Sequence, residues 1–440
     1  MSIVRRGDLL GLNARSAEYL RLNRKLARDR ADNKLLTKRV LKKRGIPHPK
    51  LLGILGNHRK VENFDWESLT GGFVIKPAKG FGGQGILLIR ASVKEPGKFI
   101  LPGGKRVGVE DLKLHALDVV EGRYSHNSLP DKAMIEERIN IHPKFKKMAV
   151  GGAPDVRVIV FNNVPVMAML RLPTEESGGK ANLHQGAIGL GIDLATGITT
   201  YGVYKNESIK YFPDTNKKVN GITIPHWDKI LRMSVETQMA SRLAYLSVDM
   251  LIDAENGPVV LELNDQPGLS IQIANMQGLR KRLERVEGIL VDTPEKGVRI
   301  AKTLFALEFA NRVKFDTQEK KQVKVIDRVR IKPHKGKRVS VDVKVDTGAF
   351  STSIDRAFAE KLGLLSDEHV LLTRKFKSAL GEETRKLIGV DFVLKGRIIK
   401  TCASVTGRSH LQYNMIIGRR DLKGFLVDPL IDDEMINVRK

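Results

Sequence analysis

The sequence predicts an α+β protein of more than one domain that ends in a small all-β domain. At 440 residues, the chain is long enough for two or three domains and a substantial core. Helical and strand-like apolar patterns are mixed over roughly the first three hundred residues. Residues 312–324 are charged and nearly free of apolar periodicity, which indicates a linker, and short alternating strands follow it.

The chain begins with a basic segment. Residues 1–33 carry many cations and a partial apolar stripe, which predicts helical structure. The run NKLLTKRVLKKRG continues as a predicted helix that ends at Gly45. Pro47 and Pro49 then favour an extended chain.

The next stretch, FVIKPAKGFGGQGILLIR at residues 73–90, contains a literal match to G-x-G-x-x-G. Strand patterns flank the glycines on both sides, so no helix N-terminus is available to hold a dinucleotide pyrophosphate. In a protein kinase the glycine loop precedes the strand with the lysine, whereas here Lys76 comes first. Taken alone, Lys76 could be an edge lysine with its head in water. Followed by a glycine hairpin, it is better interpreted as a phosphate-neutralising lysine beneath a lid of backbone N–H groups.

Further strands and helices follow in order. AMIEERI predicts a strand, and DVRVIVFNNVPVMAMLRLP predicts a hairpin around an Asn162–Asn163 turn. TEESGGKANLHQGA is polar and rich in glycine, and it predicts a loop. Residues 226–246 predict a helix, and YLSVDMLID and PVVLELN predict a strand pair across the AENG turn.

Acidic and amide side chains gather on this last strand pair. In LELN a period of two places Glu262 and Asn264 on one face, while Leu261 and Leu263 point into the core. Across the turn, the partner strand could bring Asp249 alongside. Two carboxylates and an amide are oxygen ligands that suit Mg²⁺ bridging phosphate oxygens. The alternative for Glu262 alone is an ordinary solvated acid at a strand end.

The bulk composition limits the possible partners. The net charge of +26 fits either a polyanionic partner or a field that attracts ATP and carboxylates. Aromatic residues make up only 5% of the chain, which disfavours sequence-specific nucleic-acid recognition. The single cysteine, Cys402, excludes an intramolecular disulfide framework. With no secretory signal and no transmembrane segment expected from the apolar runs, we expect a cytoplasmic protein.

The order of these motifs resembles the ATP-grasp ligases. The chain shows, in sequence, the lysine before GFGGQG, then EE, DVR, Arg171, NLHQG, VDML and LELNDQPGL. It most resembles the alpha-L-glutamate ligase branch, which includes the ribosomal-protein glutamate ligase. The resemblance implies an ATP-grasp fold, two α+β subdomains clasping ATP, over residues 34–311. The dinucleotide match is then accidental.

The resemblance also implies roles for individual residues. For ATP it implies the set Lys34, Lys76, Gly82, Gly83, Gln84, Gly85, Glu137, Arg138, Ile139, Asp155 and Asn182. For Mg²⁺ or Mn²⁺ it implies Asp249, Glu262 and Asn264, and near the transferred phosphate it implies Arg171 as a catalytic residue. In the sequence alone, Asp155 could instead form a structural ion pair with Arg157 on the same strand face.

The implied reaction is phosphorylation of a carboxylate by ATP, followed by attack of an amine to give an amide or peptide bond. The product would be a peptide or protein that carries an added glutamate or a similar amino acid. Family members usually have a full domain before their first lysine, whereas only 33 residues precede Lys34. The ATP site is therefore the part of the resemblance that transfers best.

The C-terminal part, residues 325–440, resembles the retropepsin-like aspartic protease fold and a bacterial family labelled ATP-dependent zinc proteases. The resemblance is carried by VDVKVDTGAF and MIIGRR. In aspartic proteases, the aspartates of two Asp-Thr-Gly loops share one proton. This chain has one such loop, so the resemblance implies that Asp346 would act only in a homodimer. The zinc label finds little support, because the domain has no H-E-x-x-H and its histidines are far apart in sequence.

Two other functions remain open from the sequence. Proteolysis or peptide binding could be the main activity, with the ATP-grasp part as a regulatory module. Alternatively, the chain could be a non-catalytic basic protein that associates with ribosomes or RNA.

Overall fold

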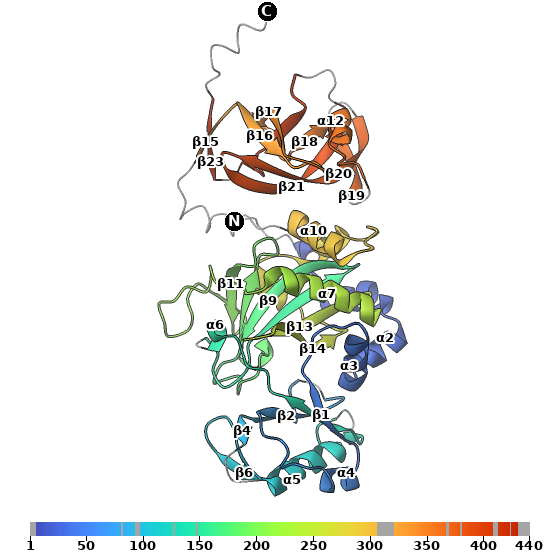
Figure 1. The fold of residues 1–440 in the computed structure, drawn as a ribbon, viewed down its shortest axis with the longest axis vertical. Helices are drawn as coiled ribbons and strands as arrows, with labels where there is room; N and C mark the ends of the chain where they lie inside the picture. Colours follow the sequence, from blue (N-terminus) through green and yellow to red (C-terminus); the bar gives the residue numbers. More distant parts are fainter. Residues whose placement is uncertain are drawn as a thin grey trace, which may run out of the picture. The chain divides into compact units, whose positions relative to one another are not determined.

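The computed structural model describes residues 6–80, 82–92, 97–125, 128–146, 148–305, 321–366, 369–378, 381–407, 412–422 and 424–429. It divides into two compact units (Figure 1). The first unit comprises Met1–Asp193 and Gly197–Glu287, and the second comprises Leu194–Thr196 and Gly288–Lys440. Residues 312–320 of the expected linker lie outside the described residues, and its last four residues form strand β15 (Lys321–Lys324).

The N-terminal segment is a series of short helical pieces. These are η1 (Arg6–Asp8), α1 (Leu12–Ala14), η2 (Arg15–Tyr19), η3 (Leu20–Leu22) and α2 (Lys25–Ala31). The longer α3 (Lys34–Lys43) follows, and the Asn33 side chain accepts hydrogen bonds from the amides of Leu35 and Leu36 at its start. Gly45, with φ of 65°, lies just beyond its end, where the sequence predicts a stop.

A small antiparallel sheet follows, with the strand order β1-β7-β2-β3. The strands are β1 (Leu51–Leu55), β7 (Ala133–Glu137), β2 (Phe73–Pro77) and β3 (Leu87–Ile89). Helices α4 (His58–Glu62) and α5 (Val109–Val120) and a side sheet of β4 (Ala91–Ser92), β5 (Lys98–Ile100) and β6 (Arg106–Gly108) complete this part. The glycine loop joins β2 to its antiparallel neighbour β3, which confirms the predicted strand–loop–strand unit.

The large sheet of the first unit is antiparallel, with the order β12-β11-β10-β9-β8-β13-β14. Its strands are β12 (Glu207–Ile209), β11 (Thr199–Tyr204), β10 (Ile188–Ile192), β9 (Val164–Leu172), β8 (Asp155–Phe161), β13 (Tyr245–Asp253) and β14 (Gly257–Asn264). Every residue of β8, β9 and β13 is buried, so both faces of the sheet are covered there. Asn162 and Asn163 have φ of 51° and 59°, which confirms the predicted two-residue hairpin turn.

Helix α7 (Trp227–Ser241) contacts β8, β9 and β13. It ends earlier than the predicted residue 246, because Arg242 adopts the left-handed conformation and Tyr245 already begins β13. Helices α8 (Ile271–Asn275) and α9 (Leu279–Glu284) contact β9. Among the described residues, no helix is both long and apolar enough to cross a membrane.

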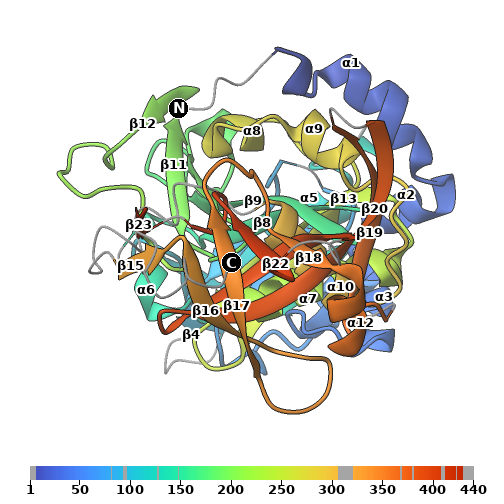
Figure 2. The same cartoon turned by 90° about the horizontal axis from the view of Figure 1, so that it is seen from above.

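The second unit contains α10 (Pro294–Leu304) and a sheet with the order β16-β17-β22-β18-β21-β20-β19. The strands are β16 (Ile326–Ile331), β17 (Val339–Asp346), β22 (Met415–Gly418), β18 (Ser353–Asp355), β21 (Arg397–Thr406), β20 (Gly381–Leu394) and β19 (Val370–Ser378). An additional pairing of β16 with β20 closes the sheet. Figure 2 shows the strands of this unit from above. Helix α12 (Arg356–Lys361) follows β18, and β15 pairs in parallel with β23 (Phe425–Asp428). The predicted small β domain is therefore confirmed, and its sheet closes into a barrel.

Candidate functional site

The pairing of four strands of the large sheet places charged residues in two adjacent cross-strand rows, which together we call the charged row. Arg171 of β9 lies opposite Asp155 of β8, and Arg157 of β8 lies opposite Asp249 of β13. Asp249 in turn lies opposite Glu262 of β14, because a β-bulge shifts the register of this hairpin by one residue. Residues up to 92 positions apart in sequence thus become neighbours through the pairing of antiparallel strands.

Short hydrogen bonds connect the side chains of this row. Arg171 donates from Nε and Nη2 to Asp155, at 2.6 and 2.5 Å, and Nη2 also donates to Oδ2 of Asp249 at 2.7 Å. Arg157 donates to both oxygens of Asp249, at 2.7 and 2.6 Å. Asp155 and Arg157 therefore pair with residues on strands to either side, not with each other as considered from the sequence.

These side chains are almost fully buried, and Asp249 is 0% exposed. Burial acts to raise the pKa of Asp249, but Arg157 and Arg171 outweigh it and hold this pKa at about 2. Burial raises the pKa of Asp155 to about 6, against the charge of Arg171. Buried charges are expensive unless they are paired, and such clusters mark candidate functional sites.

The predicted metal ligands lie at the β14 edge of the row. Glu262 is half-buried, and a hydrogen bond with its side chain helps to lower the pKa of Asp249. Asn264 is half-buried as well, and its Oδ1 accepts from the amide of Gln266 at 3.0 Å. A β-bulge leaves Leu261 half-buried, so the prediction that it points into the core is wrong.

The oxygen donors of this edge fit Mg²⁺ in kind. Both oxygens of Asp249 already accept from guanidinium groups, so Glu262 and Asn264 are the more open donors. Within the described ranges, no three His, Cys, Asp or Glu side chains come together as a preformed metal cluster.

Two lysines and a glutamate form a second ionic group between helix α3 and the small sheet. Lys76 Nζ lies 2.8 Å from Oε2 of Glu136, and Lys38 Nζ lies 3.2 Å from Oε1. Burial lowers the pKa of Lys38 to about 8, against the charge of Glu136. Burial acts to raise the pKa of Glu136, but Lys76 and Lys38 hold it below its usual value. Lys38 was missed from the sequence, although it follows Lys34 by one helical turn and shares its face.

Lys34 connects these parts of the first unit. Its Nζ donates to the carbonyl of Gly80 at 2.6 Å, at the start of the glycine loop. Burial lowers the pKa of Lys34, and the negative charge of Glu262 is the strongest opposing influence. Lys34 is therefore hydrogen-bonded to the glycine loop and interacts electrostatically with the edge of the large sheet.

The glycine loop requires its glycines. Gly82, Gly83 and Gly85 have φ of 60°, 73° and 69°, which side chains with a Cβ rarely adopt, while Gln84 is exposed. A Cβ at Gly83 would lie 3.3 Å from Cδ of Lys180, so the glycine loop lies close to the polar loop after β9. Because it lacks side chains at these positions, the backbone of the glycine loop can lie close to the polar loop after β9.

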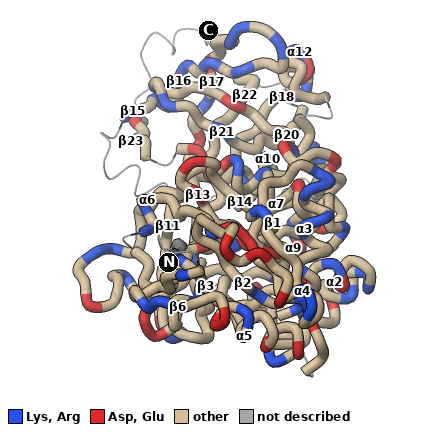
Figure 3. The backbone as a smooth tube through the Cα atoms, turned by 60° about the horizontal axis from the view of Figure 1, so that its bottom comes forward, with Lys and Arg blue, Asp and Glu red and all other residues tan. Residues whose placement is uncertain are grey.

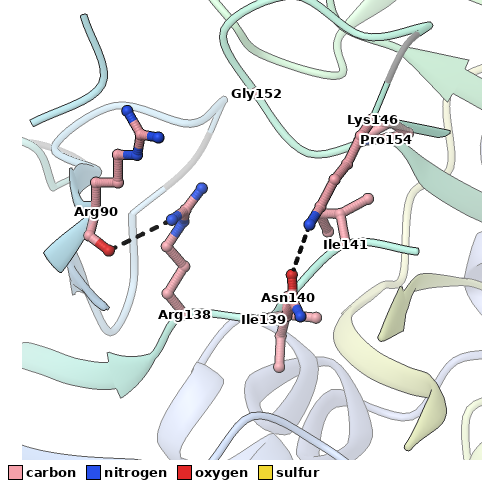
Figure 4. A pocket seen from close by; sticks show the side chains of 8 residues that line it. All are labelled: Arg90, Arg138, Ile139, Asn140, Ile141, Lys146, Gly152 and Pro154. Carbon is pink, nitrogen blue, oxygen red and sulfur yellow. Dashed lines mark hydrogen bonds between the residues drawn. The ribbon is translucent and has the colours of Figure 1, made fainter. Parts of the chain in front are cut away.

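The segment Glu137–Ile139, which the resemblance implies is the hinge that holds adenine, adjoins a cavity of about 370 Å³ (Figure 4). Its lining is Arg90, Arg138, Ile139, Asn140, Ile141, Lys146, Gly152 and Pro154, with no carboxylate. Burial, and then the charge of Arg90, lowers the pKa of Arg138, while Lys146 donates to Oδ1 of Asn140 at 2.9 Å. Glu137, just before this lining, accepts from the amide of Lys50 at 2.7 Å. The cavity thus offers space beside the backbone of Arg138 and Ile139.

The side chain of Asn182 stabilises the turn that it begins. Its side chain accepts from the amide of His184 at 3.1 Å and caps η5 (Leu183–Gln185). The turn ends at Gly186, with φ of 95°, and β10 then pairs with β9. The turn leads directly into the strand beside Arg171, which lies opposite Gly189.

In the C-terminal barrel, Asp346 ends β17 and lies opposite Gly418 of the parallel strand β22. Its Oδ1 accepts from the amides of Gly348 and Ala349 at 2.9 and 3.0 Å. The two motifs of the sequence, DTGA and IIGR, are therefore neighbours. His334 and His369, which are far apart in sequence, also meet, with Nδ1 and Nε2 3.1 Å apart.

Comparisons with known proteins give one family and several distant structures. A model of a family described as sugar-transfer associated ATP-grasp matches residues 14–288. The ATP-grasp ligase PsnB, solved with a minimal precursor, is 14% identical with a TM-score of 0.34, over 60% of this chain and 62% of that chain. The D-alanine–D-alanine ligase from Bacillus anthracis, solved with ATP, is 16% identical with a TM-score of 0.33, over 67% and 71% of the two chains.

A protein of unknown function from Legionella pneumophila is 13% identical, with a TM-score of 0.17, over 26% of this chain and 96% of that chain. No curated protein sequence matches the chain.

Proposed function

Because the chain belongs to the sugar-transfer associated ATP-grasp family, we propose that it is an ATP-dependent carboxylate–amine ligase. The predicted ATP-grasp fold of the first unit is confirmed by this membership. The proposal rests on one observation. The buried ion pairs Arg171–Asp155 and Arg157–Asp249 lead to the half-buried carboxylate of Glu262. The charge of Glu262 in turn interacts with Lys34 beside the glycine loop.

The reaction proceeds in two steps. A carboxylate oxygen of the substrate attacks the γ-phosphorus of ATP, and the bond to ADP breaks. An amine nitrogen then attacks the acyl carbon, loses a proton, and inorganic phosphate leaves as the amide forms. Both steps need positive charge around a transferring phosphoryl group and exclusion of water.

The chain supplies this charge from three cations. Lys34 and Lys76 contact the ATP phosphates beneath the glycine loop, where Gly82, Gly83, Gln84 and Gly85 offer backbone N–H groups. Arg171 stabilises the phosphoryl group in transfer: Asp155 and Asp249 fix its Nε and Nη2, and its Nη1 donates to none of the described residues. Asn182 contacts the same region from its turn.

Magnesium would be held by Glu262 and Asn264, with Asp249 behind them, and would supply further positive charge to the phosphate oxygens. Glu137, Arg138 and Ile139 hold adenine at the hinge beside the cavity. Asp155 contacts the nucleotide only through Arg171, because both of its oxygens already accept from that guanidinium.

For the substrates, we propose glutamate or a similar amino acid as the added group and a peptide or protein as its acceptor. The motifs NLHQGA and LELNDQPGL support this choice. The family description, sugar-transfer associated, adds amino sugars and sugar acids to the compounds that should be tested.

The test is ADP release by the full chain with Mg²⁺-ATP, across amino acids, short acidic peptides and amino sugars, with mass spectrometry of the products. We expect ADP release that depends on one added compound and yields a new amide, and we expect Glu262→Ala to abolish it. Turnover of ATP without any amide, or amide formation that survives Glu262→Ala, would contradict the proposal.

A second role is proposed for the barrel. The pairing of the DTGA and IIGR strands supports a retropepsin-like domain that binds or trims peptides as a homodimer, since one chain supplies a single Asp346. Cleavage of a peptide product that is lost in Asp346→Asn, with ligation unaffected, is the expected result. Cleavage that persists in this variant would assign the activity elsewhere.

A further inference from the structure

The N-terminal segment lies along the first unit, with one residue in about four buried from Tyr19 onward. The anchors are Leu10, Tyr19, Asn23, Ala27 and Ala31. The Asn23 side chain donates to the carbonyl of Tyr245 at 2.7 Å, and its Oδ1 accepts from the same residue's amide at 3.0 Å. The spacing of four between most anchors fixes which residues point away from the unit.

Large apolar side chains lie on the outward side of this segment. Leu9, Leu12, Leu22 and Leu26 are 44%, 64%, 42% and 73% exposed. Exposed cations, namely Arg21, Arg24, Lys25 and Arg28, are interleaved with them in sequence. We call these eight residues the leucine–arginine face. Exposed leucines gathered in so short a segment indicate a binding surface.

The cations of this face are only partly compensated, because Asp32 and Asp265 interact electrostatically with Arg28 but at a distance. None of the four forms an ion pair with a described residue. Residues 21–44 contain eleven lysines and arginines but only two aspartates. The end of α3 adds Arg39, Lys42, Lys43 and Arg44, all exposed, and Figure 3 shows the basic positions along α2 and α3. An anionic partner would therefore meet an excess of positive charge.

We propose that the leucine–arginine face docks the protein onto an anionic lipid surface. The leucines enter the region between headgroups and acyl chains, while the arginines and Lys25 contact lipid phosphates. The alternative polyanion, RNA, fits this face less well. The only Phe, Tyr or Trp between residues 6 and 63 is Tyr19, which is buried, so no such ring is offered for base stacking. Exposed leucines would also gain nothing from a phosphate backbone.

Binding to an anionic lipid surface would place the ligase at a membrane, whatever reaction it catalyses. Substrates carried on lipids, or made at a membrane, would then meet the enzyme at the surface. The assignment can be tested with the full chain even if the substrates remain unidentified.

The experiment is co-sedimentation of the full chain with vesicles of phosphatidylcholine alone and of equal parts phosphatidylcholine and phosphatidylglycerol. We expect binding to the anionic vesicles only. The triple variant Arg24→Glu, Lys25→Glu, Arg28→Glu should lose at least about tenfold in partitioning. The matched control reverses three exposed lysines elsewhere on the first unit, Lys210→Glu, Lys217→Glu and Lys218→Glu, and should retain most binding.

A second variant separates lipid from RNA. Leu22→Gln with Leu26→Gln keeps every charge and should still weaken vesicle binding several-fold, because the apolar contribution is lost. Unchanged thermal midpoints would show that both variants fold. Equal losses in the control triple, vesicle binding indifferent to the leucine variant, or tighter binding to single-stranded RNA that needs Arg24, Lys25 and Arg28 would each overturn the proposal.

Discussion

Two aspartates of this chain, Asp249 in the large sheet and Asp346 in the barrel, are held in opposite ways. Asp249 is completely buried and accepts three hydrogen bonds from the guanidinium groups of Arg157 and Arg171. Asp346 is half-buried and accepts from the amides of Gly348 and Ala349, two and three residues further along its own turn. One carboxylate depends on three strands of a folded sheet, and the other on its own turn.

The two aspartates differ in how much of the surrounding fold is needed to stabilise their charge. Taking several ions out of water costs free energy that their pairing only partly returns, so a row such as that of Asp249 needs a sheet that holds it in place. A carboxylate that accepts from amides two or three residues ahead forms a common local turn at little cost. The large sheet thus holds a charged site within one chain, whereas Asp346 would need a second carboxylate from another copy of the chain.

The largest expected effect comes from Asp249→Asn. The amide cannot neutralise Arg157, whose guanidinium would stay buried without a counter-charge. We expect the free energy of unfolding to fall by about 3–5 kcal/mol, measured by urea denaturation of the full chain. Adding Arg157→Met should restore part of the loss. If Asp249→Asn unfolds as wild type does, the row is not held as described.

Next in size is Lys76→Met, which tests whether the second ionic group serves ATP. Loss of a charged contact to phosphate should reduce kcat/KM for ATP by about ten- to a hundredfold, since such hydrogen bonds contribute roughly 1.5–3 kcal/mol. Lys79→Met is the matched control: its side chain is exposed three residues further on, and it should stay near wild type. Equal effects of both changes would point to general charge rather than to a contact.

A smaller effect should appear with pH. With both lysines charged, Lys38, Lys76 and Glu136 sum to one positive charge, and loss of the Lys38 proton near pH 8 reduces this sum to zero. Nucleotide affinity should therefore weaken several-fold, by about 1 kcal/mol, as the pH rises through about 8. Titration with a fluorescent ATP analogue from pH 6.5 to 9.5 measures the change. The Lys38→Met variant should bind weakly throughout and show no step, whereas a step that survives would belong to another group.

Much of the fold was predictable because short local patterns determine it. The β8–β9 hairpin follows from the Asn162–Asn163 turn, and the β13–β14 hairpin follows from the AENG turn. A β-bulge, which the sequence did not predict, is needed to bring Glu262 opposite Asp249. The end of α7 was missed, because a non-glycine residue, Arg242, takes the left-handed conformation there.

The partners of the charged residues were less predictable. Sequence places Asp155 and Arg157 on one face of a strand, but only the order of the strands decides that they pair outward, with Arg171 and Asp249. The ion pair of Lys38 with Glu136 joins a helix to a strand 98 residues away, and no local pattern contains it. Side chains at such long range depend on how the whole unit packs.

The smallest effect is expected for Asp346→Asn, which tests the other half of the comparison directly. Asparagine keeps the oxygen that accepts from Gly348 and Ala349, and Asp346 forms no ion pair with a described residue. The free energy of unfolding should therefore change by less than about 0.5 kcal/mol, and ADP release should not change. A loss comparable to that of Asp249→Asn, measured in the same denaturation series, would mean that Asp346 also lies in a built charge site, with a partner carboxylate or cation supplied by a second copy of the chain. The same measurement over a range of protein concentrations would then separate the two cases, because a site shared between copies is stabilised by mass action and a local turn is not.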